Sequence, residues 1–161
     1  MSDCPFCQLF NQGRQDGAQL YEDDLLYAAH YEAGEATTYL GYLVFGTKRH
    51  ATIADLTDDE ARGVGLLAAR LSRALRDVVH AEKVYVYTFG EAYQHLHCFA
   101  VARYPHTPPE YLRLRLLDWP DAPRADAEQI AVLCAQLRDV LKGPVASGDG
   151  EPRPDDPALA R

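Results

Sequence analysis

Residues Gln94–Arg103 read QHLHCFAVAR, an apolar run that opens with two histidines separated by one leucine. Aromatic and β-branched side chains favour a strand, and successive side chains of a strand point to opposite faces of its sheet. The run therefore predicts a strand that carries His95 and His97 on one face, together with Phe99 and Arg103. At a rise of about 3.3 Å per residue, the Cα atoms of the two histidines lie roughly 6.6 Å apart. Two imidazoles at that separation can serve adjacent sites.

Four other segments have the composition of strands, and each is bounded by turn residues. They are residues 19–21, 25–30, 41–45 and 84–89. The polar residues 22–24 separate the first two segments, which predicts a hairpin. With the histidine-bearing strand, the sequence therefore predicts a sheet of about five strands.

The clearest helix begins at Thr57, because Thr57 and Glu60 have the spacing of a capping box. Apolar residues then recur at helical spacing as far as about His80, and they form one apolar face. These residues are Val64, Leu67, Ala68, Leu71, Leu75 and Val78. A helix with one apolar face must pack on something apolar, and the predicted sheet is the natural partner.

A second amphipathic helix carries apolar residues from Ile130 to Leu141, and we expect it to end at Gly143 in a left-handed conformation. The proline-rich residues 104–123 predict irregular structure. Residues 144–161 are rich in Pro, Gly, Asp and Ala and predict a disordered tail. The length of 161 residues suits one core, so we expect a single domain over residues 1–143.

The charge balance limits the classes of partner. The chain has 16 basic and 24 acidic residues and a net charge of −8, which argues against coating nucleic acid or an anionic membrane. Small phosphorylated ligands need only a local cluster of donors, which Lys48, Arg49 and Arg103 could supply. The sequence has neither a secretory signal nor an apolar run of about 20 residues. We therefore expect a soluble, cytoplasmic protein.

Cysteines in a reducing compartment seldom form a disulfide framework, so the close pair Cys4 and Cys7 predicts a metal-binding or redox-active site. Zinc favours four cysteine or histidine ligands, and a Cys-x-x-Cys turn supplies two of them. Spacing cannot choose the other two among the six histidines. These are His30, His50, His80, His95, His97 and His106.

The basic stretch before His50, the capped helix and the strand with His95 and His97 resemble the core of the histidine triad family. In that family a basic stretch ending in histidine precedes the helix, and a strand carries His-x-His-x-His. The resemblance runs from about Cys4 to Tyr104, roughly two-thirds of the chain. It implies an α+β fold, with an antiparallel sheet of about five strands, one main helix packed on it and a C-terminal helix. It also implies a homodimer.

The zinc-containing branch of the family, which includes galactose-1-phosphate uridylyltransferase, implies a structural zinc site. Its ligands here would be the two cysteines, the histidine before the helix and the first histidine of the motif. These residues are Cys4, Cys7, His50 and His95. The resemblance also implies that the middle histidine, His97, attacks the α-phosphorus of a nucleotide and forms a nucleotidyl-histidine intermediate. Imidazole suits this role, because one nitrogen attacks while the other holds the ring through a hydrogen bond.

The sequence departs from the family pattern around the substrate. Phe99 replaces the third histidine, where the transferase branch carries glutamine, and so offers no hydrogen bond to a leaving group. Glu91 stands where glutamine is common, and a carboxylate near a phosphate is repulsive unless it is protonated or turned away. Glu32 is the candidate for the acidic residue that contacts the ribose. Arg103, on the same face as His97, is a candidate donor to substrate.

Three functions remain open on these residues. The first is a nucleotidyl hydrolase or transferase acting on a nucleoside-monophosphate ester, anhydride or phosphoramidate through His97. The second is a zinc-stabilised nucleotide-binding or interaction protein without efficient catalysis, as Phe99 and Glu91 would suggest. The third, a hydrolase with zinc-activated water, requires an open coordination position, which four protein ligands would close.

Overall fold

The computed structural model of the chain describes residues 4–13, 16–31 and 37–143. The predicted tail at 144–161 and the candidate residue Glu32 lie outside the described residues. The helices and strands are α1 (Pro5–Gln12), β1 (Gln19–Glu22), β2 (Leu26–His30), β3 (Thr38–Tyr39), β4 (Tyr42–Thr47), α2 (Asp58–Val78), β5 (Lys83–Tyr87), β6 (His97–Arg103), β7 (Arg124–Ala125) and α3 (Ala127–Lys142). Three short 3₁₀ helices are η1 (Ile53–Asp55), η2 (Pro109–Tyr111) and η3 (Arg113–Asp118).

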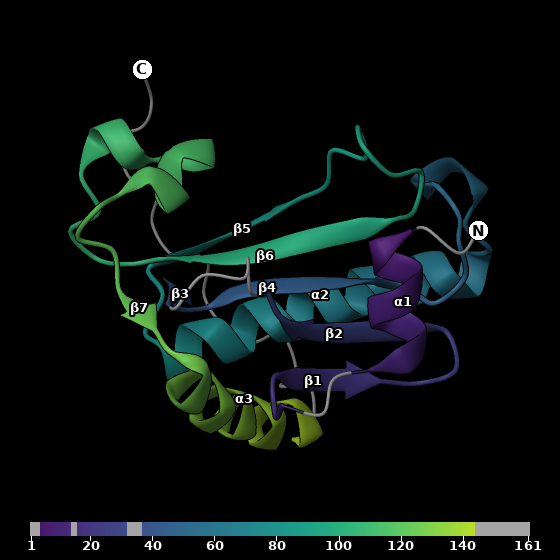
Figure 1. Cartoon of the computed structure of the whole chain (residues 1–161), viewed down its shortest axis with the longest axis horizontal. Coiled ribbons are helices and arrows are strands. Elements are labelled where there is room, and N and C mark those ends of the chain that lie inside the picture. The colour runs from purple at the N-terminus through teal and green to yellow at the C-terminus, as the bar shows by residue number, and fades with distance from the viewer. Residues whose placement is uncertain (1–3, 14–15, 32–36, 144–161) are drawn as a thin grey trace, which may run out of the picture.

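The five long strands form one antiparallel sheet in the order β1-β2-β4-β6-β5 (Figure 1). β2, β4 and β6 are almost entirely buried, whereas β5 at the end of the sheet is half-exposed. The α+β fold and the five-stranded antiparallel sheet predicted from the sequence are therefore confirmed. The predicted hairpin is also present, and Asp23 closes its turn by accepting hydrogen bonds from the backbone of Leu25 and Leu26.

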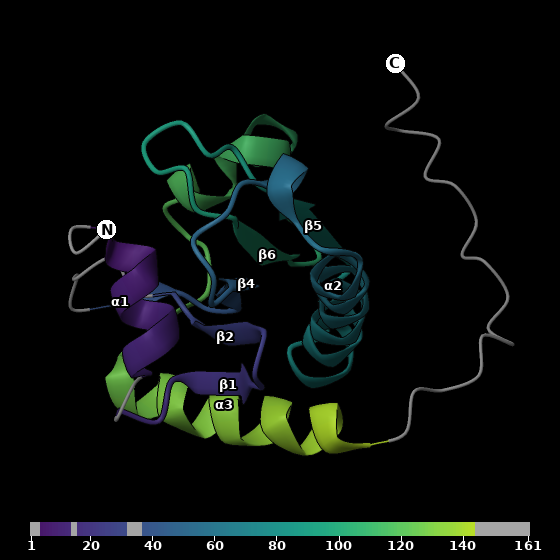
Figure 2. The same cartoon turned by 90° about the vertical axis from the view of Figure 1, so that its right-hand side faces the viewer.

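The two faces of the sheet are covered by different helices, as Figure 2 shows. On one face, alternate residues of β6 such as Cys98 and Ala100 pack in the same core as Leu71 of α2. On the other face, Phe99 packs with a smaller cluster that includes Phe6 and Phe10 of α1. Residues 97–100 therefore alternate between the two faces as predicted, and α1 covers the face that carries His97.

Both long helices begin with a capping box. Thr57 accepts a hydrogen bond from the backbone of Glu60 as predicted, and Asp126 does the same for α3. The predicted left-handed end of α3 is wrong, because Gly143 has φ −66° and ψ 158°, an extended conformation. The last turn is instead closed by a 3₁₀-type hydrogen bond, which runs from the Gly143 N–H to the Val140 carbonyl three residues earlier. Among the described helices, none is long and apolar enough to cross a membrane.

The strand with the two histidines begins later than the sequence predicts. His95 lies before β6, because the Leu96 N–H donates to the carbonyl of Ala51 instead of pairing within the sheet. Sheet pairing starts with His97 opposite Gly46. The backbone of Leu96 passes so close to Gly46 that a Cβ there would lie 2.2 Å from the Leu96 carbonyl oxygen. A glycine is therefore required in β4, opposite the start of β6.

Two regions have more structure than the sequence indicates. Residues 5–12 form the helix α1, although the Cys-Pro-Phe-Cys motif alone suggested only a tight turn. The proline-rich residues 104–123 contain η2 and η3, and they are followed by β7, which pairs with β3. Short 3₁₀ turns and two-residue strands have no periodic pattern, so they could not be predicted from local residues.

Candidate functional site

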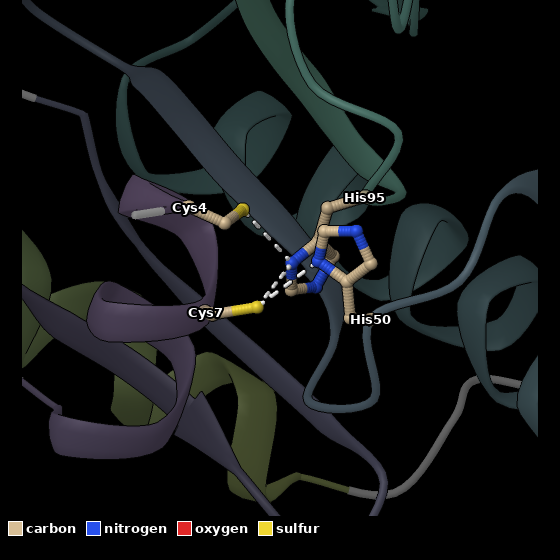
Figure 3. Close-up of side chains that lie close together, drawn as sticks. All are labelled: Cys4, Cys7, His50 and His95. Carbon is tan, nitrogen blue, oxygen red and sulfur yellow. Dashed lines mark hydrogen bonds between the residues drawn. The ribbon is translucent and has the colours of Figure 1, made fainter. Parts of the chain in front are cut away.

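Four side chains from three distant segments meet at one end of the sheet (Figure 3). Cys4 and Cys7 come from α1, His50 follows β4, and His95 precedes β6. Their four ligand atoms all lie within 4.8 Å of one another. The Nδ1 atom of His95 lies 3.5 Å from the Cys4 sulfur and 3.3 Å from the Cys7 sulfur, and Nδ1 of His50 lies 3.1 Å from the Cys7 sulfur. The structure therefore brings together the four residues selected from the sequence.

The first turn of α1 places the two sulfurs side by side. Cys4 is the N-cap residue, Pro5 follows at the first helical position, and Cys7 lies one turn further on. The amide of Asn11 donates to the carbonyls of Cys7 (2.9 Å) and Lys48 (3.1 Å). These bonds tie α1 to the turn that leads into His50.

The imidazole of His95 is oriented by the backbone. Its Nε2 lies 2.6 Å from the carbonyl oxygen of Thr47, and because a carbonyl only accepts, Nε2 must carry a proton. Nδ1 then presents its lone pair to the sulfurs. Burial lowers the pKa of His95, which keeps the ring in the neutral form that binds metals.

This set of donors fits a tetrahedral zinc ion. Zinc bonds of about 2.0–2.3 Å imply separations of roughly 3.3–3.8 Å between neighbouring ligand atoms, close to the observed sulfur–nitrogen distances. Burial raises the pKa of the Cys7 thiol, as does its hydrogen bond with Cys4, so the protonated thiol is favoured without an ion. A bound cation would reverse this preference and favour the two thiolates. With two thiolates and two imidazoles the coordination would be closed, as in structural sites.

An ion pair holds the turn before His50 against the start of α2. The guanidinium of Arg49 donates to both carboxylate oxygens of Glu60, at 2.9 and 2.6 Å, and to the carbonyl of Asp55. These hydrogen bonds hold the pKa of the buried Glu60 carboxyl at about 2. The same carboxylate accepts from the Thr57 N–H, so one residue caps the helix and anchors the turn.

His97 lies next to this cluster but is not one of its four members. Its Nδ1 lies 2.7 Å from the carbonyl oxygen of His95, so Nδ1 carries the proton and Nε2 keeps a lone pair. The ring of Phe6 stacks on the imidazole with centroids 3.8 Å apart and planes at 9°. The residue is 8% exposed. The middle histidine therefore has a fixed tautomer and one covered face.

Phe99, at the position of the third histidine, belongs to an aromatic cluster that was not predicted from the sequence. The ring of Phe99 lies 5.7 Å from that of His97 and also contacts the rings of Tyr31, Tyr42 and Tyr87. Burial raises the pKa of Tyr42 and Tyr87, so both phenols stay neutral. Same-face alternation would have identified these tyrosines had the order and register of the strands been known.

The cations expected to bind phosphate are all paired with carboxylates. Lys48 contacts Glu22 at 2.5 Å, and Arg49 contacts Glu60. Arg103 is buried and contacts Glu82 at 2.9 Å. Arg103 lies six residues further along the strand than His97, so their Cα atoms are roughly 20 Å apart. Its role in substrate binding stays a prediction, and it could reach only a part of a ligand remote from His97.

A hollow of about 290 Å³ lies beside His95, between the loop before β6 and the start of η1. Its walls include Ile53, Phe89 and Tyr93, whose side chains are all substantially exposed. The lining residues are Thr52, Ile53, Thr88, Phe89, Gly90, Tyr93, Gln94, His95 and Leu96. Apart from the His95 imidazole, no lining side chain is ionisable near neutral pH. Glu91 is exposed on the same loop and is not among the lining residues, and its role in substrate binding stays a prediction.

No family model and no curated protein matches the sequence. Solved structures do match. A hypothetical histidine triad nucleotide-binding protein from Sulfolobus tokodaii strain 7 is 19% identical, with 86% of this chain and 91% of that chain covered and a TM-score of 0.64. A zinc-bound histidine triad family protein from Mycobacterium smegmatis is also 19% identical, with 87% and 94% covered and a TM-score of 0.62.

A third similar structure is a Hit-like protein from Bartonella henselae that is involved in cell-cycle regulation and was solved with an unknown ligand. It is 17% identical, with 87% of this chain and 98% of that chain covered and a TM-score of 0.63. Identities this low establish the arrangement of the backbone and not the activity. Its sheet, its helices and these three similar structures show that the chain has the fold of the histidine triad proteins.

Proposed function

We propose that the protein is a nucleotidyl hydrolase or transferase that acts at the α-phosphate of a nucleoside-monophosphate ester, anhydride or phosphoramidate. The observation that supports this most directly is the hydrogen bond from Nδ1 of His97 to the His95 carbonyl. It leaves Nε2 as the ring nitrogen with a free electron pair, which a nucleophile needs. The nucleotide-binding protein of S. tokodaii, which shares the fold, adds support.

In the proposed reaction, Nε2 of His97 attacks the α-phosphorus and the bond from phosphorus to the leaving group breaks. The leaving group takes the bonding electron pair, and the nucleoside monophosphate stays bonded to His97. Water or another acceptor then attacks the same phosphorus, loses a proton and returns the electron pair to Nε2. Throughout, the His95 carbonyl holds the Nδ1 proton and stabilises the charge that develops on the ring.

The hollow between the β5–β6 loop and η1 could hold the neutral ring system of such a ligand. Its exposed apolar walls suit a flat ring, and the hydroxyl of Thr88 and the amide of Gln94 offer hydrogen bonds to its edge. A phosphate would gain no cation there. We therefore assign the hollow to an uncharged part of the ligand.

We also propose a structural zinc ion at Cys4, Cys7, His50 and His95. The donor types, the distances between them and the tautomer of His95 support it, as does the zinc-bound protein that shares the fold. Bound there, zinc would supply folding free energy by joining α1 to the sheet. With four protein ligands it would leave no position for a catalytic water.

The test of catalysis compares the purified protein with two variants on adenosine phosphoramidate and diadenosine polyphosphates. His97→Ala should abolish turnover, whereas His106→Asn, a change at an exposed histidine, should leave it unchanged. Acid-free mass spectrometry should show wild-type protein heavier by one nucleoside monophosphate. Absence of both turnover and a trapped adduct with any nucleotide would rule out the proposal.

A second candidate function is supported by the surroundings of His97. Phe99 offers no hydrogen bond, its neighbours are neutral rings, and Lys48 and Arg49 are paired with carboxylates. These features suit a protein that binds nucleotides without efficient catalysis. Calorimetry with mononucleotides would support this alternative if wild type binds them and forms no covalent adduct.

Two further assignments rest on the resemblance to histidine triad proteins. We propose a homodimer, to which β5 would contribute as the end strand of the sheet, with Val86 46% exposed. We also propose a cytoplasmic location, which the free thiols of Cys98 and Cys134 support.

A further inference from the structure

Phe6 connects the four-residue cluster to the proposed nucleophile. It lies between Cys4 and Cys7 in α1, so its backbone position is fixed by two of the cluster residues. Its ring stacks face to face on the imidazole of His97 and also makes T-shaped contacts with the rings of His95 and Tyr93. No other ring contact of His97 among the described residues is as close or as parallel.

The orientation of the His97 ring depends on two contacts. The hydrogen bond from Nδ1 to the His95 carbonyl fixes one atom of the ring but allows the plane to tilt about that bond. The stacked ring of Phe6 sets the plane. Both contacts come from the cluster, because His95 is a member of it and Phe6 lies between two members. The direction of the Nε2 electron pair is therefore set by one cluster residue, His95, and by Phe6, which lies between two others.

The helix that carries Phe6 is short. α1 has eight residues, and its N-cap residue Cys4 makes no side-chain capping hydrogen bond. Helices of this length are not stable alone in water. α1 is held by the Asn11 bonds, the packing of Phe6 and Phe10, and the contacts of its two sulfurs with the imidazoles. Without an ion between them, those last contacts are weak hydrogen bonds.

We propose that Phe6 is a positioning residue that couples occupancy of the four-residue site to the geometry of the His97 nucleophile. With the ion bound, α1 is fixed and Phe6 holds the imidazole plane. When the ion leaves, α1 loosens, Phe6 withdraws and the ring of His97 can tilt, although the metal never contacts the substrate. This inference rests on the proposed zinc site and on the proposed role of His97.

The first arm of the test follows the His97 ring protons by NMR in zinc-loaded and chelator-treated wild-type protein. Their signals are assigned by comparison with His97→Ala. A ring stacked at 3.8 Å shifts these protons upfield, so chelation should move their signals downfield. The methyl signals of Leu71 and Leu75 should keep their chemical shifts, which shows that the core remains folded. Unmoved His97 signals in metal-free protein would overturn the coupling.

The second arm measures the first turnover, the dissociation constant for AMP and the zinc content of variants. Phe6→Leu should bind one zinc ion per chain and bind AMP as wild type does, yet form the covalent adduct about tenfold more slowly, since small misplacements of a reacting group are costly. Phe6→Tyr restores a ring and should restore the rate. Phe10→Leu is the matched control, because Phe10 lies on the same helix and packs against His95 and Tyr27.

The outcomes separate this inference from the proposed activity. If Phe6→Leu keeps the wild-type rate, or slows the reaction no more than Phe10→Leu does, Phe6 is only a packing residue and the inference is wrong. If wild type forms no adduct, the proposed activity fails, but the NMR arm still tests the coupling without any turnover. If the metal-free protein unfolds as a whole, the rates of Phe6→Leu, Phe6→Tyr and Phe10→Leu decide whether Phe6 positions His97.

Discussion

At the scale of single residues, Phe99 determines which leaving groups the proposed nucleophile could expel. Its ring stands beside His97 and is enclosed by the rings of Tyr31, Tyr42 and Tyr87. Phe99 has no proton to give to a departing amine, and phenols such as those around it are weaker acids than the imidazolium of a histidine at this position. The site therefore favours groups that leave as stable anions, such as phosphates, carboxylates or phenolates, over amines.

Restoring an imidazole at position 99 tests this interpretation. Phe99→His should raise the turnover of adenosine phosphoramidate at least about tenfold, because a positioned acid contributes 10²–10⁴-fold in other enzymes. Turnover of an anhydride substrate should change much less. The measurement is kcat/KM for both substrates, with Phe99→Leu as the control that removes the ring without adding an acid. Equal changes for both substrates would contradict the interpretation.

The close packing around Gly46 predicts that a larger residue there would destabilise the fold. A Cβ at this position would lie 2.2 Å from the Leu96 carbonyl oxygen and 2.7 Å from a carbon of the Phe10 ring. Gly46→Ala should lower the free energy of unfolding by about 2–3 kcal/mol, as overpacking does elsewhere. Gly65→Ala has nothing within 4 Å of the new Cβ, so it should stabilise α2 by about 0.5–1 kcal/mol. Urea denaturation measures both, and similar effects of the two changes would refute the argument.

At the scale of elements, the sequence was most informative where a period or a capping pattern is present. The α2 capping box, the hairpin and the five strands of the main sheet were predictable from local residues. α1 was not, because an eight-residue helix has too few turns for a period. The start of β6 was misplaced, because the Leu96 N–H donates to the carbonyl of Ala51, 45 residues earlier in the chain, instead of pairing within the sheet.

The candidate site was predictable only in part for the same reason. Local spacing identified Cys4 and Cys7, but it left six histidines open, because the ring nitrogens meet through contacts that sheet pairing creates. The family resemblance selected His50 and His95. Nothing local indicated that Phe6 would cover His97, since that contact depends on how α1 lies on the sheet.

The ion pair between Arg49 and Glu60 predicts how the start of α2 responds to pH. Hydrogen bonds from Arg49 lower the pKa of Glu60 to about 2, from an ordinary value of 4.5. A carboxyl with a lowered pKa in the folded state stabilises the protein above pH 4.5, and this contribution is lost as the pH falls towards 2. Glu60→Gln should therefore cost about 1–3 kcal/mol at pH 7 and progressively less below pH 4.

Urea denaturation of wild type and Glu60→Gln at pH 7 and pH 3 checks this prediction. Asp58→Asn is the matched control, because Asp58 is an exposed carboxylate in the same helical turn. Its effect should be small at both pH values. A cost of Glu60→Gln that does not change with pH would show that the charge of Glu60 is not what stabilises the turn.

At the scale of the whole molecule, the four-residue cluster joins three segments that lie far apart in the sequence. The purified protein should contain about one zinc ion per chain, and Cys7→Ser should lower both the zinc content and the melting temperature. A loss of a few kcal/mol corresponds to a fall of at least about 5 °C for a domain of this size. Elemental analysis and thermal melts measure the two quantities, and His106→Asn should leave both unchanged. A zinc-free protein with an unaltered melting temperature would contradict the proposed site.

The proposed dimer makes a separate prediction. The wild-type protein should sediment at twice its chain mass of 17.9 kDa. Val86→Lys places a charge on the half-exposed end strand and should shift the equilibrium towards the monomer. Val132→Lys is the matched control, because Val132 is also exposed but lies on α3. A monomeric wild type, or equal effects of the two lysines, would rule out a dimer through β5.

The spacing of the cluster along the chain has a consequence for biosynthesis. Cys7 and His95 are 88 residues apart. At translation rates of about 5–20 residues per second, the second thiol waits roughly 4–18 s on the ribosome before its last partner is made. During that interval the nascent chain presents two thiols that oxidants or competing metals can reach. Yield in the cell should therefore depend on cellular reductants and zinc supply while the polypeptide is still being made.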